Sequence, residues 1–203
     1  EEKPFVQLRV FIDANTGEII DAYDTLEYDT LSGDVSGMIY PVFSNQPQIE
    51  VPFKSQWVYI NNSQYKTDND GNYLASGLSG IVNINANLEG PWANVSNIQQ
   101  NRASHSASVT LPTTHSWNWK LSGNDISYKQ EESNAFYHTN IIHDYITKSS
   151  LAVSEMNLQM KVRVNYASSC NAFYSGDSIN FYQANGRNCE SSALSSGVIY
   201  HEY

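Results

Sequence analysis

The amino-acid sequence predicts an α+β fold that is mostly β. Charged residues make up only 16% of the chain, and 14 of its 203 residues are Tyr. Such a polar, uncharged and aromatic composition suits strands. Segments from residue 35 onward alternate apolar and polar side chains with a period of two, as half-buried strands do. The strongest helical pattern lies in one stretch, 131–148. We therefore expect strands first, and then a smaller part in which a sheet combines with helices.

The charge balance and the absence of long apolar runs narrow the classes of partner. Eleven basic residues against twenty-one acidic ones give a net charge of −10, which argues against a nucleic-acid partner. No run of 18 apolar residues occurs, so we expect no membrane span. The chain opens EEKPFVQLRV, with neither a Met nor a basic leader, and we expect a mature fragment or an engineered piece.

The two cysteines bear on the location of the protein. Cys170 and Cys189 flank a turn-rich loop, which predicts one disulfide, with two free thiols as the alternative. Closing this loop would stabilise the fold by about 3 kcal/mol. Acceptor sequons for N-glycosylation occur at Asn61 and Asn94. We expect a secreted, extracellular protein.

The N-terminal unit is predicted over 1–29. Residues 5–12 and 19–24 are rich in strand formers and are separated by D-A-N-T-G-E, in which Asn and Gly favour a tight turn, so we expect a β-hairpin. Residues 24–34 lack a helical apolar face and are expected to be a linker. The order strand, D-x-x-T-G-E, strand resembles the closing hairpin of propeptides in secreted thermolysin-like and fungalysin-like enzymes; any β-hairpin is the alternative.

A β-sandwich module is predicted over 30–112. The D-N-D-G turn at 68–71 favours a hairpin over a calcium loop, because position 79 is Ser where an EF-hand needs Glu. The G-x-V-x-G start at 33–37 and the T-D-x-D-G-N-Y turn at 67–73 resemble a carboxypeptidase-regulatory-like β-sandwich. His105 and, just beyond this module, His115 are expected to be surface residues and not metal ligands.

The third unit is predicted over 113–203. Ser133 is a candidate N-cap for the helix at 131–148. His138 and His143 are five residues apart, about 140° round a helix, so one regular helix cannot present both to one metal. We expect both to be buried and hydrogen-bonded. Residues 156–166 alternate like a central or next-to-edge strand.

The end of the chain carries a partial catalytic motif. Residues 190–203 suggest a helix that ends on His201-Glu202-Tyr203. His-Glu begins the motif H-E-x-x-H, in which two His bind zinc and the Glu acts as base. The second His would lie two residues beyond Tyr203. Upstream, N-A-F-Y at 171–174 and I-N-F-Y at 179–182 resemble the edge strand that precedes the zinc helix of thermolysin-like peptidases. The cysteine pair and S-N-A-F-Y-H-T-N-I-I-H-D-Y-I at 133–146 resemble the fungalysin branch of the gluzincins.

This resemblance implies an activity and a set of roles. It makes 113–203 the partial N-terminal lobe of a fungalysin-like zinc metallopeptidase, with His201 as zinc ligand and Glu202 as general base. The residues expected to bind a peptide or protein substrate as an added strand are Asn171, Ala172, Phe173 and Tyr174. Zinc is expected in the full-length parent and not in this chain, since a catalytic site needs three protein ligands. We expect the chain alone to be catalytically incomplete.

Two alternatives remain open. The chain is also compatible with a non-enzymatic secreted β-sandwich module that binds protein or glycan. Aromatic residues that could stack on a sugar, or instead fill a core, occur at positions 57, 59, 92, 117 and 119. The other alternative is self-association, in which an open sheet edge at 171–182 pairs with a neighbouring chain.

Overall fold

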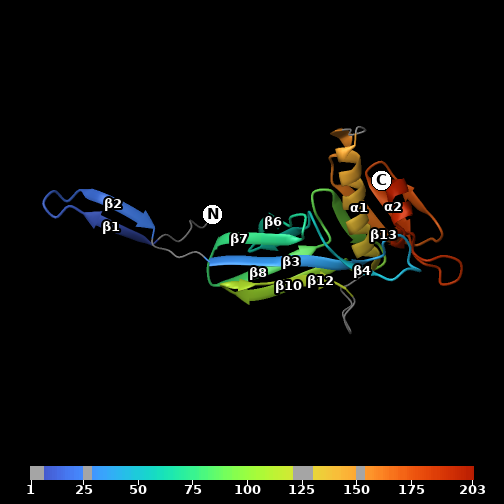
Figure 1. The fold of residues 1–203 in the computed structure, drawn as a ribbon, viewed down its shortest axis with the longest axis horizontal. Helices are drawn as coiled ribbons and strands as arrows, with labels where there is room; N and C mark the ends of the chain where they lie inside the picture. Colours follow the sequence, from blue (N-terminus) through green and yellow to red (C-terminus); the bar gives the residue numbers. More distant parts are fainter. Residues whose placement is uncertain (1–6, 25–28, 121–129, 150–153) are drawn as a thin grey trace.

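The structure is a computed structural model that describes residues 7–24, 29–120, 130–149 and 154–203. Within these residues the strands form four sheets, and the two α-helices lie toward the C-terminal end (Figure 1). The prediction of a mostly β fold with several sheets and few helices is confirmed. The assignment of the C-terminal part to a thermolysin-like lobe is not.

The predicted N-terminal hairpin is present. Strands β1 (Leu8–Ile12) and β2 (Ile19–Asp24) pair antiparallel, and the hairpin projects away from the rest of the molecule (Figure 1). The carboxylate of Asp13 accepts the backbone N–H groups of Asn15 and Thr16 at 2.7 and 3.0 Å, which closes the turn. Gly17 supplies a φ of +77°, which an L side chain rarely adopts.

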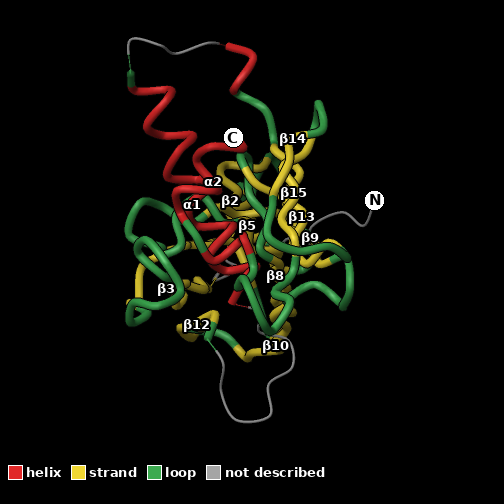
Figure 2. Tube along the Cα trace, turned by 90° about the vertical axis from the view of Figure 1, so that its right-hand side faces the viewer, coloured by secondary structure: helices red, strands yellow, loops and turns green. Residues whose placement is uncertain are grey.

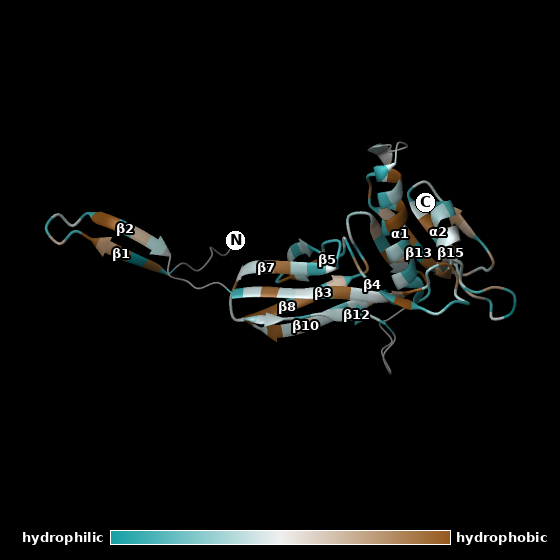
Figure 3. Cartoon of the chain, in the orientation of Figure 1, coloured by the Kyte–Doolittle hydropathy of each residue, from teal (hydrophilic) through white to brown (hydrophobic). Residues whose placement is uncertain are grey.

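The longest strand, β3 (Asp29–Ile39), organises the first sheet of the central body. It pairs antiparallel with β4 (Ile49–Pro52) and β7 (Asn72–Leu78), and parallel with β11 (Thr113–Thr114) and β12 (Trp117–Trp119). The predicted linker at 24–34 is therefore wrong from Asp29 onward. Leu31 is fully buried, and a Cβ on Gly33 would lie 1.9 Å from the His115 carbonyl oxygen, so close packing replaces the expected loop. Figure 3 shows apolar and polar residues alternating along β3.

The second sheet has the order β10-β8-β5-β6 and is antiparallel throughout. Its strands are β10 (Ser104–Thr110), β8 (Ile81–Asn87), β5 (Trp57–Ile60) and β6 (Ser63–Lys66). One face of β5 and β8 is fully buried, through Val58, Ile60, Val82 and Ile84. These side chains belong to the same hydrophobic cluster as Leu31 of β3, so the two sheets enclose one core as in a β-sandwich.

The third sheet has the order β14-β15-β13-β9 (Figure 2). Its strands are β14 (Ala172–Tyr174), β15 (Ser178–Tyr182), β13 (Met160–Tyr166) and β9 (Ala93–Asn97). As predicted, β13 is an inner strand, and it runs parallel to both neighbours. Because β9 precedes residue 113, this sheet crosses the predicted boundary between the second and third units. The division into 1–29, 30–112 and 113–203 stays a prediction.

Helix α1 (Gln130–Lys148) packs on this sheet and confirms the predicted helix. Ser133 lies inside the helix and is buried, so its predicted role as N-cap is wrong. Glu132, also buried, accepts the Asn97 side-chain N–H at 3.1 Å and the Ala103 backbone N–H at 2.8 Å. These two bonds connect α1 to β9 and to the segment before β10.

Candidate functional site

The last helix, α2 (Ser196–Glu202), carries the two residues on which the peptidase resemblance rests. The side chain of His201 is exposed, and that of Glu202 is half-buried. Across the ranges that the structure describes, no group of three or more His, Cys, Asp or Glu side chains could hold a metal ion.

Beside α2 lies β14, an edge strand of the third sheet (Figure 2). The carbonyl oxygen of Asn171 accepts the N–H of Tyr182 at 3.2 Å, so Asn171 turns its main chain toward β15. Successive residues of an antiparallel strand turn their main-chain groups to alternate sides. The N–H and C=O groups of Ala172 and Tyr174 therefore face outward, where an added strand would pair.

The side chains of this segment differ in what they can contact. Ala172 is buried, and the ring of Phe173 packs against those of Tyr166 and Tyr182, at centroid distances of 5.4 and 5.7 Å. Tyr174 is 53% exposed. Of the residues expected to bind a peptide, the main chain of β14 and the side chains of Asn171 and Tyr174 are thus accessible, whereas Phe173 belongs to an aromatic cluster.

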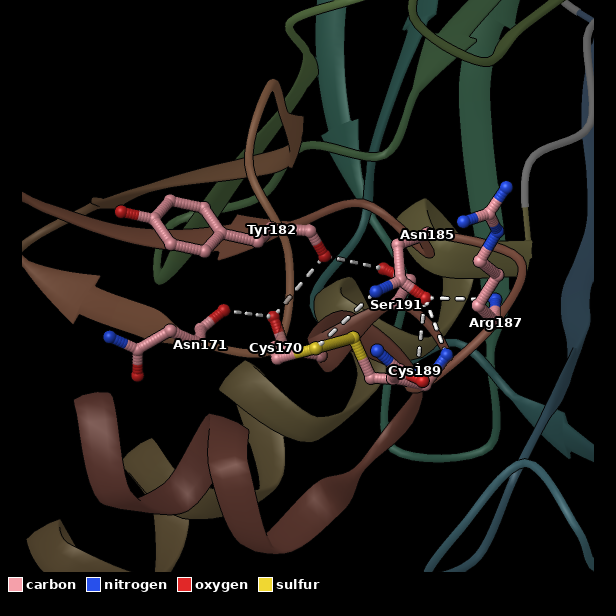
Figure 4. Close-up of a disulfide and its surroundings, with 9 residues drawn as sticks. Cys170, Asn171, Tyr182, Asn185, Arg187, Cys189 and Ser191 are labelled. Atoms are coloured by element: carbon pink, nitrogen blue, oxygen red, sulfur yellow. Dashed lines mark hydrogen bonds between the residues drawn. A yellow bond between two sulfur atoms is a disulfide. The ribbon is translucent and has the colours of Figure 1, made fainter.

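A disulfide fixes the loop that leads from β15 toward α2. Cys170 and Cys189 are bonded, with their Cα atoms 5.5 Å apart, which confirms the predicted pairing (Figure 4). Inside this loop the side-chain oxygen of Asn185 accepts the backbone N–H groups of Arg187, Asn188 and Cys189 at 2.8–3.2 Å. Covalent and hydrogen bonds together therefore shape the loop.

Two cavities lie near the two ends of β14. One, of about 730 Å³, lies at the start of the strand, between the disulfide and α2. The other, of about 480 Å³, lies at the far end, beside Tyr174 and Gly176. His201 and Glu202 line both, so the cavities meet at the last turn of α2. We call the two cavities together the β14 groove.

The first cavity combines apolar and acidic groups. Phe43, Leu194 and Val198 supply its apolar lining, and the carboxylates of Glu190 and Glu202 also line it. An uncharged or basic side chain would fit these walls better than an acidic one. Except for Glu202, these residues were not predicted from the sequence, because they come from distant segments without a shared motif.

His138 of α1 holds α2 in place. Its Nε2 lies 2.9 Å from the Tyr40 carbonyl oxygen, and its Nδ1 lies 2.8 Å from the Tyr200 hydroxyl. A carbonyl only accepts, so Nε2 carries the proton and Nδ1 accepts from Tyr200. Burial lowers the pKa of His138, and its bond to Tyr40 offsets this in part. His138 is thus a buried, hydrogen-bonded residue, as predicted.

Three further histidines pack against other rings. His143 stacks on Trp92 with ring centroids 4.0 Å apart, and its Nε2 lies 3.3 Å from the Asn157 side-chain oxygen. His105 and His115 approach each other with their Nε2 atoms 2.8 Å apart, and both are half-buried. The expectation that these two are ordinary surface residues is wrong, because β10 and the β11–β12 connection bring them together.

Comparisons with known proteins place the chain in no family. No protein-family model matches it, and no curated protein matches it. Among solved structures, a DUF3823 family protein from Parabacteroides merdae is similar at 16% sequence identity, over 45% of this chain and 44% of that one, with a TM-score of 0.26. The chain thus spans less than half the length of that structure, and a likeness this weak supports no inference about function.

The predicted fungalysin-like zinc metallopeptidase is corrected by these findings. Neither the family models nor the arrangement of His, Cys, Asp and Glu in the described residues supports it. The roles of His201 as zinc ligand and Glu202 as general base were inferred from that resemblance alone. The zinc expected in a full-length parent had the same basis. No helix among the residues described here is long and apolar enough to cross a membrane. The disulfide is compatible with an extracellular protein.

Proposed function

We propose that the chain is a non-enzymatic, secreted binding module that holds an extended peptide segment of another protein along β14. The observation that carries this proposal is an edge strand with outward main-chain groups that borders a groove. An extended peptide that adds to such an edge gains main-chain hydrogen bonds whatever its sequence.

The two cavities supply the selectivity that main-chain pairing lacks. Side chains of an added strand alternate between its two faces, so one set would lie over the cavities at either end of β14. A volume of about 730 Å³ falls within the range of small-molecule pockets, so the first cavity is large enough to receive a side chain. Because Glu190 and Glu202 line it, we expect peptides with apolar and basic side chains to be preferred over acidic ones.

Secretion is part of the proposal and rests on the disulfide. Disulfides form and persist in oxidising compartments and are rare in the cytosol. The bond between Cys170 and Cys189 forms part of the wall of the first cavity. An oxidising environment would therefore preserve the β14 groove.

Replacing Tyr174 by Pro tests the pairing. Proline removes the outward N–H, and an edge strand tolerates this change because the group faces solvent. An array of short random peptides would first identify a ligand, whose affinity would then be measured by fluorescence anisotropy. We expect Tyr174→Pro to weaken binding about tenfold, since one main-chain hydrogen bond is lost. Tyr174→Val, which keeps the N–H, is the matched control for loss of the ring.

Three results would contradict the proposal. One is the absence of any bound peptide on the array, and another is equal affinity for the Pro and Val variants. The third is cleavage of the bound peptide, detected by mass spectrometry, because a binding module returns its ligand intact. Light scattering could instead show a dimer that Tyr174→Pro dissociates and Tyr174→Val does not. In that case the edge of β14 pairs with a second copy of the chain and not with a peptide.

A further inference from the structure

The outer face of the second sheet has a regular composition that the β14 groove does not explain. On β10 the outward side chains carry hydroxyls: Ser104, Ser106, Ser108 and Thr110. On β8 they are Ile81 and three amides, Asn83, Asn85 and Asn87. We call this surface, together with the outward residues of β5 and β6, the amide face.

The strand register aligns these side chains into rows. Ser106 pairs with Asn85, Asn85 with Tyr59 of β5, and Tyr59 with Gln64 of β6. Neighbouring strands lie about 4.8 Å apart, and side chains two residues apart on one strand are separated by about 6.7 Å. The result is a two-dimensional array of hydroxyls, amides and aromatic rings on one side of one sheet.

Charge is nearly absent from the array, although the chain as a whole carries −10. Lys66 of β6 is the one charged residue among the outward strand positions. At the rim, Arg102 pairs with Glu89 at 3.3 Å. In the part of the chain described, no hydrogen bond to another residue engages the side chains of Asn85, Asn87 or Ser106. Their donors and acceptors are therefore available to a ligand.

Two aromatic rings complete the surface. Trp57 and Tyr59 are two residues apart on β5, so they share its outer face, and both are half-exposed. The other aromatic residues considered for sugar stacking pack inside the protein. Trp117 and Trp119 are only 9% and 3% exposed, and Trp92 stacks on His143. Burial, with the nearby Glu89 carboxylate, raises the pKa of Tyr59, so its hydroxyl stays neutral.

We propose that the amide face binds an uncharged polysaccharide. Sugar hydroxyls are both donors and acceptors, which matches amides and hydroxyls, and the apolar faces of pyranose rings stack on aromatic side chains. A protein partner would favour a dehydrated apolar centre, whereas the middle of this face is Asn85 beside Tyr59. The near absence of charge favours a neutral chain over an acidic one. The proposal is independent of peptide binding, because it uses a different sheet.

Binding to defined polysaccharides tests the inference. The full chain would be incubated with microcrystalline cellulose, chitin, mannan and, as an acidic probe, polygalacturonate, and the unbound fraction measured. We expect retention on at least one neutral polymer and none on polygalacturonate. Tyr59→Ala should weaken retention by roughly two- to tenfold, the range of an aromatic contact. Asn85→Lys should weaken it as well. Tyr145→Ala, on α1 and 72% exposed, is the matched aromatic control and should bind like the wild type.

Each result decides the proposal. Circular dichroism and thermal unfolding would establish that the variants fold, and Asn85→Lys changes only an exposed position. Retention that depends on Tyr59 and Asn85 but not on Tyr145 supports the amide face. Lack of retention on every neutral polymer, or equal retention of all variants, overturns it. A dimer that dissociates on Asn85→Lys, without glycan retention, would assign the face to self-association and also overturn it.

Discussion

Burial sets the charge of the packed histidines. It lowers the pKa of His115, of His138 and of His143, and for the last two a hydrogen bond offsets part of the effect. A protonated ring is poorly solvated at these sites, and beside His143 the Asp144 carboxylate, 3.8 Å away, offsets this cost only in part. His138 is the most consequential of them, because its two ring nitrogens join Tyr40 to Tyr200 of α2.

The stability of the fold should therefore fall in mildly acidic solution. The unfolded chain takes up these protons near pH 6.5, whereas the folded chain takes them up only at lower pH. The unfolding free energy is thus fully present above about pH 6.5 and decreases below it. Backbone N–H groups lower the pKa of Asp13 and of Asp68, so these carboxylates stay charged in this window.

Urea unfolding at several pH values from 7.5 to 5.0 would measure this dependence. His138→Gln should cost about 1 kcal/mol at pH 7.5, because one buried hydrogen bond is lost. It should also reduce the dependence on pH. Stability that is flat or rises toward pH 5.0 would show that burial does not govern these rings.

At the scale of elements, the loop between β15 and α2 is the part that most depends on a covalent bond. The disulfide closes over residues 183–189, where the Asn185 side chain also accepts three backbone N–H groups, whereas the next residues, such as Ala193 and Leu194, are buried. β15, by contrast, has fully buried side chains at Ile179 and Phe181. The loop and the sheet should therefore respond differently to loss of the bond.

Replacing both cysteines by Ser should lower the unfolding free energy by about 3 kcal/mol, the entropic value for a loop of this length. The sheet should remain folded, and peptide binding should weaken because Cys170, Cys189 and Glu190 line the first cavity. Urea unfolding and anisotropy measure the two effects. Reduction of the wild type by a phosphine should reproduce both. Undiminished peptide affinity would mean that this loop does not shape the β14 groove.

At the scale of the whole molecule, the hairpin is set apart from the sandwich. Every residue of β1 is exposed, and Ile19 and Ile20 of β2 are 66% and 68% exposed. Figure 3 shows apolar residues on both strands of this hairpin. An isolated two-stranded hairpin is marginally stable at best, so the hairpin should contribute little to the stability of the body.

Removing residues 1–28 should consequently leave the thermal midpoint within roughly 2 °C of that of the full chain. Amide exchange should be much faster for β1 and β2 than for β3. Calorimetry and exchange followed by mass spectrometry provide the measurements. A fall of many degrees on truncation would reveal packing of the hairpin against the sandwich.

Structural features that depend on residues close together in the chain could be predicted from the sequence. Turn chemistry around Asp13 and Gly17 specified the hairpin, the helical pattern specified α1, and cysteine spacing specified the disulfide. All are local in the chain, so periodicity and turn residues encode them. The peptidase interpretation failed because His201-Glu202 is a two-residue signal, and such a pair contains no information about which ligands lie near it in space.

By itself, then, the sequence determined the abundance of strands, the position of the main helix and the covalent link. Only the tertiary structure decided the rest: the parallel pairing of β9 with β13, the meeting of His105 with His115, the alignment that forms the amide face, and the groove between β14 and α2. Each of these depends on strand register and on sheet order. Many distant segments compete for the same pairing, and burial of the whole core, not any local pattern, selects among them.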